Sequence, residues 1–319
     1  MADPEILPPL QPTTPAPHPA PPPNTIFRGP NGIRAGWRAL MFLMIVCGLL
    51  LVLAVALKLA ARFLFGEIQL GGGLQLTPLG TASLEGTILF VTAGAALIMA
   101  RIERRKFGVY GLPARFAFRK DFWVGTLVGF AAISACLLGI FALHGFRLAG
   151  IAIHGNTIIT AVAAWSATFV VVGLAEEFAF RGYLQFTLTS GMGYWPSAIL
   201  LSLLFGLAHA SNPGESKLGL LSVVLFGLLF CFFLRRTGNL WWAVGFHAGW
   251  DWGQTFFYGV PDSGLAAYHN LFNSSFSGAT WLTGGSVGPE ASIFTPIVLA
   301  LVAILFSRVY RERKYQLGR

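Results

Sequence analysis

The sequence predicts an all-α protein, a polytopic helical membrane protein with about eight transmembrane helices. Of its 319 residues, 55% are hydrophobic and only 11% are charged, whereas soluble domains carry about 25% charged residues. The charged residues separate long apolar runs, so lipid rather than water is the main solvent of this chain. Lys and Arg also gather in alternate connections between these runs, which is typical of a chain that crosses a bilayer repeatedly.

The first 35 residues differ in composition from the rest of the chain. Eleven of the 18 prolines lie between positions 4 and 30. Such a stretch cannot bury a hydrophobic core, so we expect a disordered Pro-rich cytoplasmic tail at residues 1–35.

Eight apolar runs predict the transmembrane spans. The first, 39–57, contains no charge and is longer than a typical signal-peptide core, so we interpret it as a membrane helix. A span needs about 20 residues on average, and somewhat shorter runs are acceptable. The expected spans are 39–57, 84–100, 122–143, 157–188, 195–211, 218–234, 239–258 and 291–307.

The positions of Lys and Arg predict the orientation. If the N-terminus is cytoplasmic and the spans alternate, 17 of the 22 Lys and Arg residues fall on the inner side and four on the outer side, and Arg181 lies inside a span. The positive-inside rule therefore predicts that both termini are cytoplasmic. The net charge of +9 comes from residues scattered between apolar runs, so we expect the lipid bilayer and no nucleic acid as a partner.

Two adjacent carboxylates and a guanidinium stand alone inside a long apolar stretch. Residues 148–175 carry no formal charge, Glu176, Glu177 and Arg181 follow, and the next charge is Glu215. Ionisable groups inside a span are costly and usually functional. Glu177 and Arg181 can pair at i, i+4 spacing, while Glu176 points about 100° away. A cytoplasmic loop that merely carries charges is the alternative, but turn residues appear only near residue 193.

Two further segments bring histidines to a comparable depth. His209 lies as far after the turn near residue 193 as Glu177 lies before it. An antiparallel hairpin would hold both at about 20–24 Å from that turn, at a rise of 1.5 Å per residue. His247 and Asp251 share a helix face at i, i+4 spacing, and His247 lies about 12–14 Å along its helix.

Carboxylates and imidazoles at one level suit the activation of water, so the candidate catalytic residues are Glu176, Glu177, His209, His247 and Asp251. A carboxylate in a low-dielectric site becomes a stronger base, and histidines can orient the water, stabilise an oxyanion or bind a metal. Two histidines and a carboxylate also match the ligand number of zinc, for which Glu176, His209 and His247 are the candidate ligands. The three cysteines lie singly in apolar runs, so we expect no disulfide and no Cys-based zinc site.

The three segments resemble the signature of the CAAX prenyl protease and bacteriocin-processing family, also called the CPBP or Abi family. That signature reads E-E-x-x-x-R, F-x-x-x-H and H-x-x-x-N or D. This chain has Glu176-Glu177-x-x-x-Arg181, Phe205-x-x-x-His209 and His247-x-x-x-Asp251 in the same order. The resemblance implies a glutamate- or metal-dependent intramembrane endopeptidase whose site opens to the cytoplasm.

The resemblance also implies roles for these residues. Glu176 would activate water together with His209, and His247 and Asp251 would stabilise the oxyanion. Arg181 would be structural and pair with Glu177. Eukaryotic members carry Asn where this chain has Asp251, and an ionised Asp251 would oppose an oxyanion. We therefore expect Asp251 to be protonated, to bind a metal or to orient His247.

The composition, the spans and the motifs together divide the chain into four regions, and the resemblance suggests a substrate. The substrate would be a membrane-bound peptide or protein, and the compact chain with short loops is typical of the bacterial inner membrane. The regions are the tail (1–35), the N-terminal transmembrane helices (36–150), a catalytic membrane core (151–260), and an outer loop with the last transmembrane helix and a basic cytoplasmic tail (261–319).

Two other classes of function remain open at this point. Ionisable groups within a membrane also mark the pathways of transporters and channels, although the sequence shows no internal repeat. A non-catalytic immunity or scaffold member of the same family would keep the fold without the activity. Hydrolysis of a peptide by the purified protein distinguishes these classes.

Overall fold

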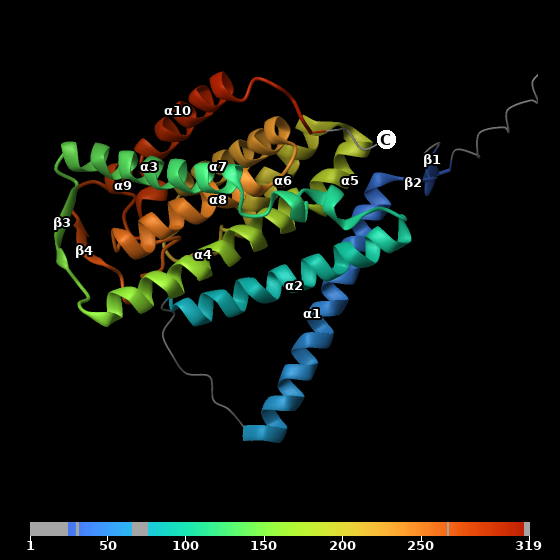
Figure 1. The fold of residues 1–319 in the computed structure, drawn as a ribbon, viewed down its shortest axis with the longest axis horizontal. Coiled ribbons are helices and arrows are strands. Elements are labelled where there is room, and N and C mark those ends of the chain that lie inside the picture. Colours follow the sequence, from blue (N-terminus) through green and yellow to red (C-terminus); the bar gives the residue numbers. More distant parts are fainter. Residues whose placement is uncertain (1–24, 30–31, 66–75, 267, 316–319) are drawn as a thin grey trace, which may run out of the picture.

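The computed structural model describes residues 25–29, 32–65, 76–266 and 268–315, and it is dominated by helices (Figure 1). Most of the predicted Pro-rich tail lies outside these residues. The main helices are α1 (Ala35–Phe65), α2 (Pro78–Ile102), α3 (Lys120–Ala142), α4 (Asn156–Arg181), α5 (Tyr183–Met192), α6 (Tyr194–Ala208), α7 (Lys217–Thr237), α8 (Trp241–Asp251) and α10 (Phe294–Val309).

Short elements connect these helices. Among them are two antiparallel strand pairs, in which β1 pairs with β2 and β3 pairs with β4. The remaining elements are β1 (Arg28–Gly29), β2 (Gly32–Ile33), β3 (Phe146–Ile151), β4 (Phe272–Phe276), α9 (Thr280–Thr283), the π-helix η3 (Trp252–Phe257), and the 3-10 helices η1 (Phe107–Tyr110), η2 (Ala114–Phe116) and η4 (Pro289–Ala291).

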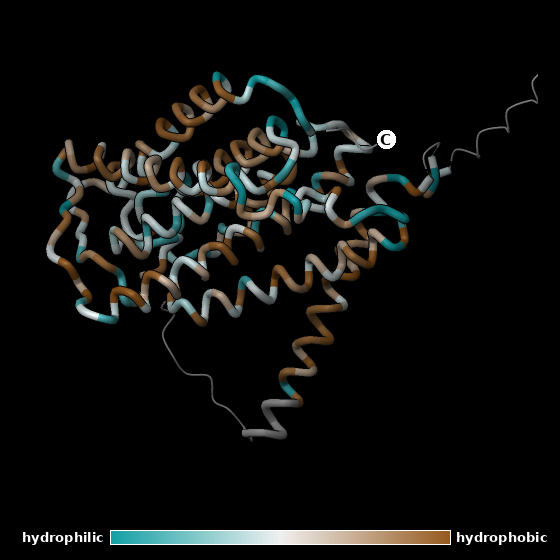
Figure 2. The backbone as a smooth tube through the Cα atoms, viewed as in Figure 1, coloured by the Kyte–Doolittle hydropathy of each residue, from teal (hydrophilic) through white to brown (hydrophobic). Residues whose placement is uncertain are grey.

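Each of the eight predicted spans falls on helical structure, six of them on a single helix and two, 157–188 and 239–258, on two consecutive helices. In the described part of the chain, five helices are long and apolar enough to cross a membrane: Ala35–Leu59, Pro78–Ile102, Lys120–Ala142, Asn156–Met192 and Lys217–Thr237. Tyr194–Ala208 and Phe294–Val309 are apolar but shorter, and α8 continues into η3. Helix α1 projects from the bundle and is hydrophobic along most of its length (Figure 2), as a lipid-facing helix would be. The predicted all-α polytopic membrane class is confirmed.

The span expected at 157–188 contains a break that the sequence pattern did not reveal. Helix α4 ends at Arg181 and α5 begins at Tyr183, because Gly182 adopts a non-helical ψ of −115°. A Cβ on Gly182 would collide with the carbonyl oxygen of Phe178, so the bend requires glycine. The turn near residue 193 is present, and Gly193 there has a φ of +88°. Glu177 therefore does not lie on one straight helix from that turn, and the predicted depth of about 20–24 Å is an overestimate.

Glycines allow α3 and α8 to pack backbone against backbone. A Cβ at Gly245 or Gly249 of α8 would collide with the α3 carbonyl groups of Phe122 and Thr126. Such a spacing of small residues is the usual means of close helix approach in membranes. The contact holds α8, which carries His247, in the centre of the bundle.

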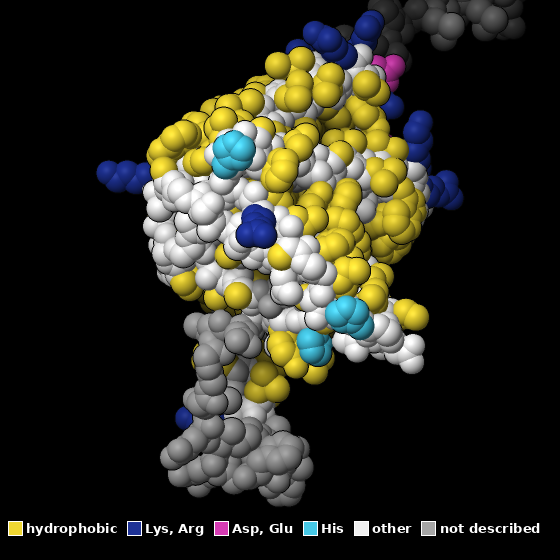
Figure 3. All heavy atoms as spheres, turned by 90° about the vertical axis from the view of Figure 1, so that its left-hand side faces the viewer, with side chains coloured by type: hydrophobic (Ala, Val, Ile, Leu, Met, Phe, Trp, Pro, Cys, Tyr) yellow, Lys and Arg dark blue, Asp and Glu magenta, His cyan; other side chains and the backbone are white. Residues whose placement is uncertain are grey.

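The basic connections gather at one end of the bundle. Arg38 of α1 pairs with Glu103 at 2.6 Å, and Arg235 lies 4.7 Å above the ring of Tyr194. Arg236 donates to the carbonyl of Arg311 in the C-terminal segment. Strands β3 and β4 lie at the opposite end (Figure 1), whose surface shows broad hydrophobic areas and few charged side chains (Figure 3).

This arrangement predicts the outcome of a topology experiment. Single cysteines at Arg105→Cys and Lys314→Cys should react with an impermeant thiol reagent from one side of the membrane, and Ser211→Cys from the other. The reason is that the first two positions lie at the basic end, and Ser211 follows the opposite end of α6. Labelling in sealed cells and in inverted vesicles measures this, with the unmodified protein as the blank. Reaction of all three cysteines from the same side would contradict the orientation of the bundle.

Candidate active site

The predicted site residues meet around one cavity of about 530 Å³. Its walls come from α2, α4, α6, α7 and α8, together with the segments that contain Asp262 and Glu290. Glu176, His209, His247 and Asp251 line the cavity. The structure thus brings together side chains that lie up to 75 positions apart in the chain.

Glu177 and Arg181 form a buried ion pair beside the cavity. The Arg181 Nη1 donates to Glu177 Oε1 at 3.4 Å, and neither side chain is exposed. The guanidinium lies 4.2 Å above the ring of Phe205, and the missing Cβ of Gly227 leaves room for its Nη2. A buried charge needs such a partner, because an unpaired one costs several kcal/mol.

Glu177 also holds His247 in place. The Nδ1–H of His247 donates to Glu177 Oε1 at 3.1 Å, because a carboxylate oxygen only accepts. The imidazole stacks on Phe230 with ring centroids 5.2 Å apart. Gly173 of α4 lies against the His247 Cβ and would make a Cβ contact at 3.5 Å. These contacts direct the other ring nitrogen, Nε2, towards the remaining carboxylates.

The Nε2 atom of His247 lies between two carboxylates. It is 3.7 Å from Glu176 Oε2 and 3.5 Å from Asp251 Oδ2. The Glu176 side chain is 21% exposed, whereas that of Asp251 is 8% exposed. Glu176 is therefore the carboxylate of this group that water reaches most easily.

His209 shares the cavity but comes from a different wall. Its Nδ1–H donates to the carbonyl of Phe205 at 2.8 Å, which leaves Nε2 as the nitrogen available to a bound water. The ring of Phe205 lies 5.1 Å from that of Phe180 in α4. Glu176 lies about one turn before Phe180, and His209 lies about one turn after Phe205. If α4 and α6 are antiparallel, both steps lead in the same direction and place Glu176 and His209 at a similar level.

Three carboxylates at the cavity were not selected from the sequence. They are Glu85 of α2, Asp262 and Glu290. Glu85 could have been found, because it is an acidic residue inside the expected span 84–100. Asp262 and Glu290 fall in an expected outer loop, and nothing in the local sequence indicates that this loop folds inwards.

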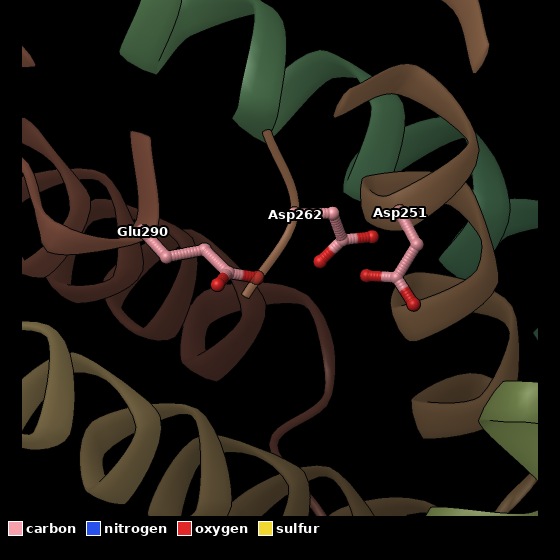
Figure 4. Close-up of side chains that lie close together, drawn as sticks. All are labelled: Asp251, Asp262 and Glu290. Carbon is pink, nitrogen blue, oxygen red and sulfur yellow. The ribbon is translucent and has the colours of Figure 1, made fainter. Parts of the chain in front are cut away.

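Asp251, Asp262 and Glu290 are buried residues of the cavity lining, and their carboxylates lie close together (Figure 4). One oxygen of each lies within 4.8 Å of the others, and this is the set of potential metal ligands found in the described residues. Thr255 donates to Asp262 at 2.6 Å, and Ser263 donates to Glu290 at 3.2 Å.

Burial shapes the charge of this cluster. Burial raises the pKa of the Asp262 carboxyl, and burial followed by the charges of Asp262 and Asp251 raises the pKa of Glu290 well above its ordinary value. Closely spaced carboxylates cannot all ionise without a cation. The cluster therefore holds at least one proton or can accept a cation, and an oxygen-only donor set suits a hard cation better than zinc.

The cavity lies towards the end of the bundle away from the basic connections. Its lining includes residues 76–85 at the start of α2, 208–212 at the end of α6, and 262–265. Gly80, Leu84 and Ala208 are its exposed members. Under the positive-inside orientation, this end faces the outer side of the membrane. The positive-inside orientation and the cytoplasmic opening implied by the family resemblance therefore cannot both hold for this structure.

Comparison with known families identifies a match over part of the chain. Residues 157–253 match the family model described as type II CAAX prenyl endopeptidase, Rce1-like, and no curated protein matches the chain. The matched segment covers less than a third of the chain but extends from α4 to the start of η3. It contains all three predicted motifs, so the resemblance that they carry is confirmed. Glu85, Asp262 and Glu290 lie outside the matched segment.

Proposed function

Because residues 157–253 carry an Rce1-like segment of the type II CAAX prenyl endopeptidase kind, we propose that this membrane protein is an active intramembrane endopeptidase. It hydrolyses a peptide bond in a membrane-associated or lipidated protein or peptide. The observation that carries the proposal is the convergence of Glu176, His209, His247 and Asp251 on one cavity. A membrane helix bundle does not need such groups for packing, since polar residues there are costly.

Glu176 acts as the general base. It removes a proton from water while the water oxygen attacks the carbonyl carbon of the peptide, and His209 Nε2 orients that water. When the C–N bond breaks, Glu176 returns the proton to the leaving nitrogen. The products are a carboxylic acid and an amine, and the enzyme regains its initial protonation. General acid–base catalysis of this kind contributes about 10²- to 10⁴-fold to the rate.

His247 and Asp251 face the developing oxyanion. The Nε2–H of an imidazolium at His247 donates to it, and Glu177 keeps the ring in the required orientation. Asp251 serves as a donor in its protonated form. The proximity of Asp262 and Glu290 supports that form, because like charges disfavour ionisation. This protonation reconciles an aspartate at position 251 with oxyanion stabilisation.

Zinc remains the alternative to a purely glutamate-based mechanism. Its candidate ligands are Glu176, His209 and His247. The Nδ1 of each histidine is held by Phe205 or Glu177, which leaves Nε2 for a ligand role. In the described residues, however, these three side chains do not form a group whose ligand atoms lie within 4.8 Å of one another, so they would have to move closer together to hold zinc. A bound zinc ion would supply an acidic water molecule.

For its location, we propose the bacterial inner membrane with both termini in the cytoplasm. The gathering of Arg38, Arg105, Arg235 and Lys314 at one end of the bundle supports this orientation.

The test is hydrolysis of peptides by the purified protein in lipid nanodiscs. We expect cleavage of farnesylated or membrane-anchored peptides, detected by mass spectrometry, and the same rate after incubation with 1,10-phenanthroline. Loss of cleavage with the chelator and recovery with zinc would instead assign the zinc mechanism. Absence of cleavage of every anchored peptide, together with ion flux in proteoliposomes that Glu176→Gln abolishes, would contradict the proposal and favour a transporter.

A further inference from the structure

Glu85 is a carboxylate of the cavity with no role in the mechanism above. It belongs to α2, which packs against α4, and it lines the cavity together with Glu176 and His247. It lies outside the family-matched residues 157–253. Its function is therefore a property of this chain rather than of the matched motifs.

Glu85 presents an acceptor without a donor. Its Oε2 atom is shielded from solvent and has no hydrogen-bond partner among the described residues. Leaving a buried acceptor unsatisfied costs about 1–3 kcal/mol, and more for a charged group. Glu176 and His247 line the same cavity as Glu85. His247 already has Glu177, Glu176 and Asp251 around it, so it does not supply the missing donor.

The charges that line the cavity indicate which kind of ligand group would donate to Glu85 Oε2. The described lining contains five carboxylates and two histidines, but no lysine and no arginine; the carboxylates are Glu85, Glu176, Asp251, Asp262 and Glu290. The lining also includes three aromatic side chains, Phe169 of α4, Phe226 of α7 and Trp250 of α8. Carboxylates beside aromatic faces form a favourable environment for an organic cation.

We propose that Glu85 is a specificity-determining residue that binds a lysine or arginine side chain of the peptide substrate. The inference rests on the proposed endopeptidase function. The cation fills the unpaired acceptor of Glu85, and its charge favours the ionised form of the carboxylate. Because Glu85 and Glu176 line the same cavity, the cationic residue lies within a few positions of the cleaved bond.

The experiment compares matched peptides. Membrane-anchored, N-acetylated peptides carry lysine, norleucine or glutamine at each position near the cleaved bond, and kcat/KM is measured for each. The wild-type protein should prefer lysine at one position. Glu85→Gln keeps the shape and an N–H donor but removes the charge, so the ratio of kcat/KM for lysine over norleucine should fall about 10- to 100-fold, mainly through KM. Glu85→Lys should reverse the preference.

Glu215→Gln is the matched control. It makes the same chemical change in the connection between α6 and α7. Glu215 accepts a hydrogen bond from the backbone N–H of Ser216, and it does not line the cavity. It should leave the lysine-to-norleucine ratio unchanged. Equal losses for lysine and norleucine peptides in Glu85→Gln would overturn the proposal, because they would indicate a role in positioning Glu176. A wild-type protein without any preference for lysine would overturn it as well.

A binding measurement separates this proposal from the proposed function. The lysine and norleucine peptides are given a fluorescent label and titrated onto the Glu176→Gln protein in nanodiscs. The double variant Glu85→Gln, Glu176→Gln is titrated in the same way for comparison. Preferential binding of the lysine peptide that disappears in the double variant supports the Glu85 assignment, even if the wild-type protein cleaves nothing. Cleavage of the peptides without preferential binding of the lysine peptide would support the endopeptidase function and contradict the role of Glu85.

Discussion

Glu176→Gln should lower kcat/KM for a cleaved peptide by about 10²- to 10⁴-fold, the usual contribution of a general base. Glutamine keeps the size of the side chain but cannot accept the proton of the attacking water. Glu176 makes no buried ion pair comparable with that of Glu177, and its side chain is 21% exposed. Yield and melting temperature should therefore stay close to those of the wild type, and single-turnover kinetics should show that the chemical step is slowed.

The control for this variant is Glu312→Gln, which removes a carboxylate that is 80% exposed and does not line the cavity. It should retain the wild-type rate. If Glu176→Gln cleaves peptides at the wild-type rate while remaining folded, Glu176 is not the base, and the assignment would pass to another carboxylate of the cavity.

Arg181→Ala should lower stability by about 3–5 kcal/mol, because it leaves Glu177 as an unpaired buried charge. The side chains of Arg181 and Glu177 are both inaccessible, so water cannot replace the missing partner. The guanidinium also fills the space beside Phe205 and Gly227, and its loss leaves a void. Thermal unfolding followed by size-exclusion chromatography should show a lower melting temperature and a lower yield.

A second substitution separates the charge effect from the void. Glu177→Gln in the Arg181→Ala background removes the stranded charge and keeps an acceptor for the Nδ1–H of His247, so part of the lost stability should return. Arg101→Ala, at an exposed position, is the matched control and should unfold like the wild type. A single Arg181→Ala variant that melts at the wild-type temperature would show that Glu177 is neutral or finds another partner.

The resemblance to a membrane protease is visible in the amino-acid sequence because its signals are local. An apolar run is long because lipid surrounds it, and a charge inside such a run stands out whatever its neighbours are. The spacing of Glu176, Glu177 and Arg181 can be read within one helix, and so can the i, i+4 spacing of His247 and Asp251. The bend at Gly182 was not predicted, because the apolar pattern continues across it and a single glycine in a helix is often tolerated.

The sequence by itself determined the all-α membrane class, the helical pairing of Glu177 with Arg181, and the set of motif residues. Only the tertiary structure decided that Glu177 orients His247, that Asp262 and Glu290 join Asp251, and that the cavity opens away from the basic end. These features depend on contacts between helices and on a loop that folds back into the bundle. Helical period and hydropathy describe which face of a segment avoids water. They contain no information on which distant segment meets that face, and this is why the cavity appears only once the helices are packed.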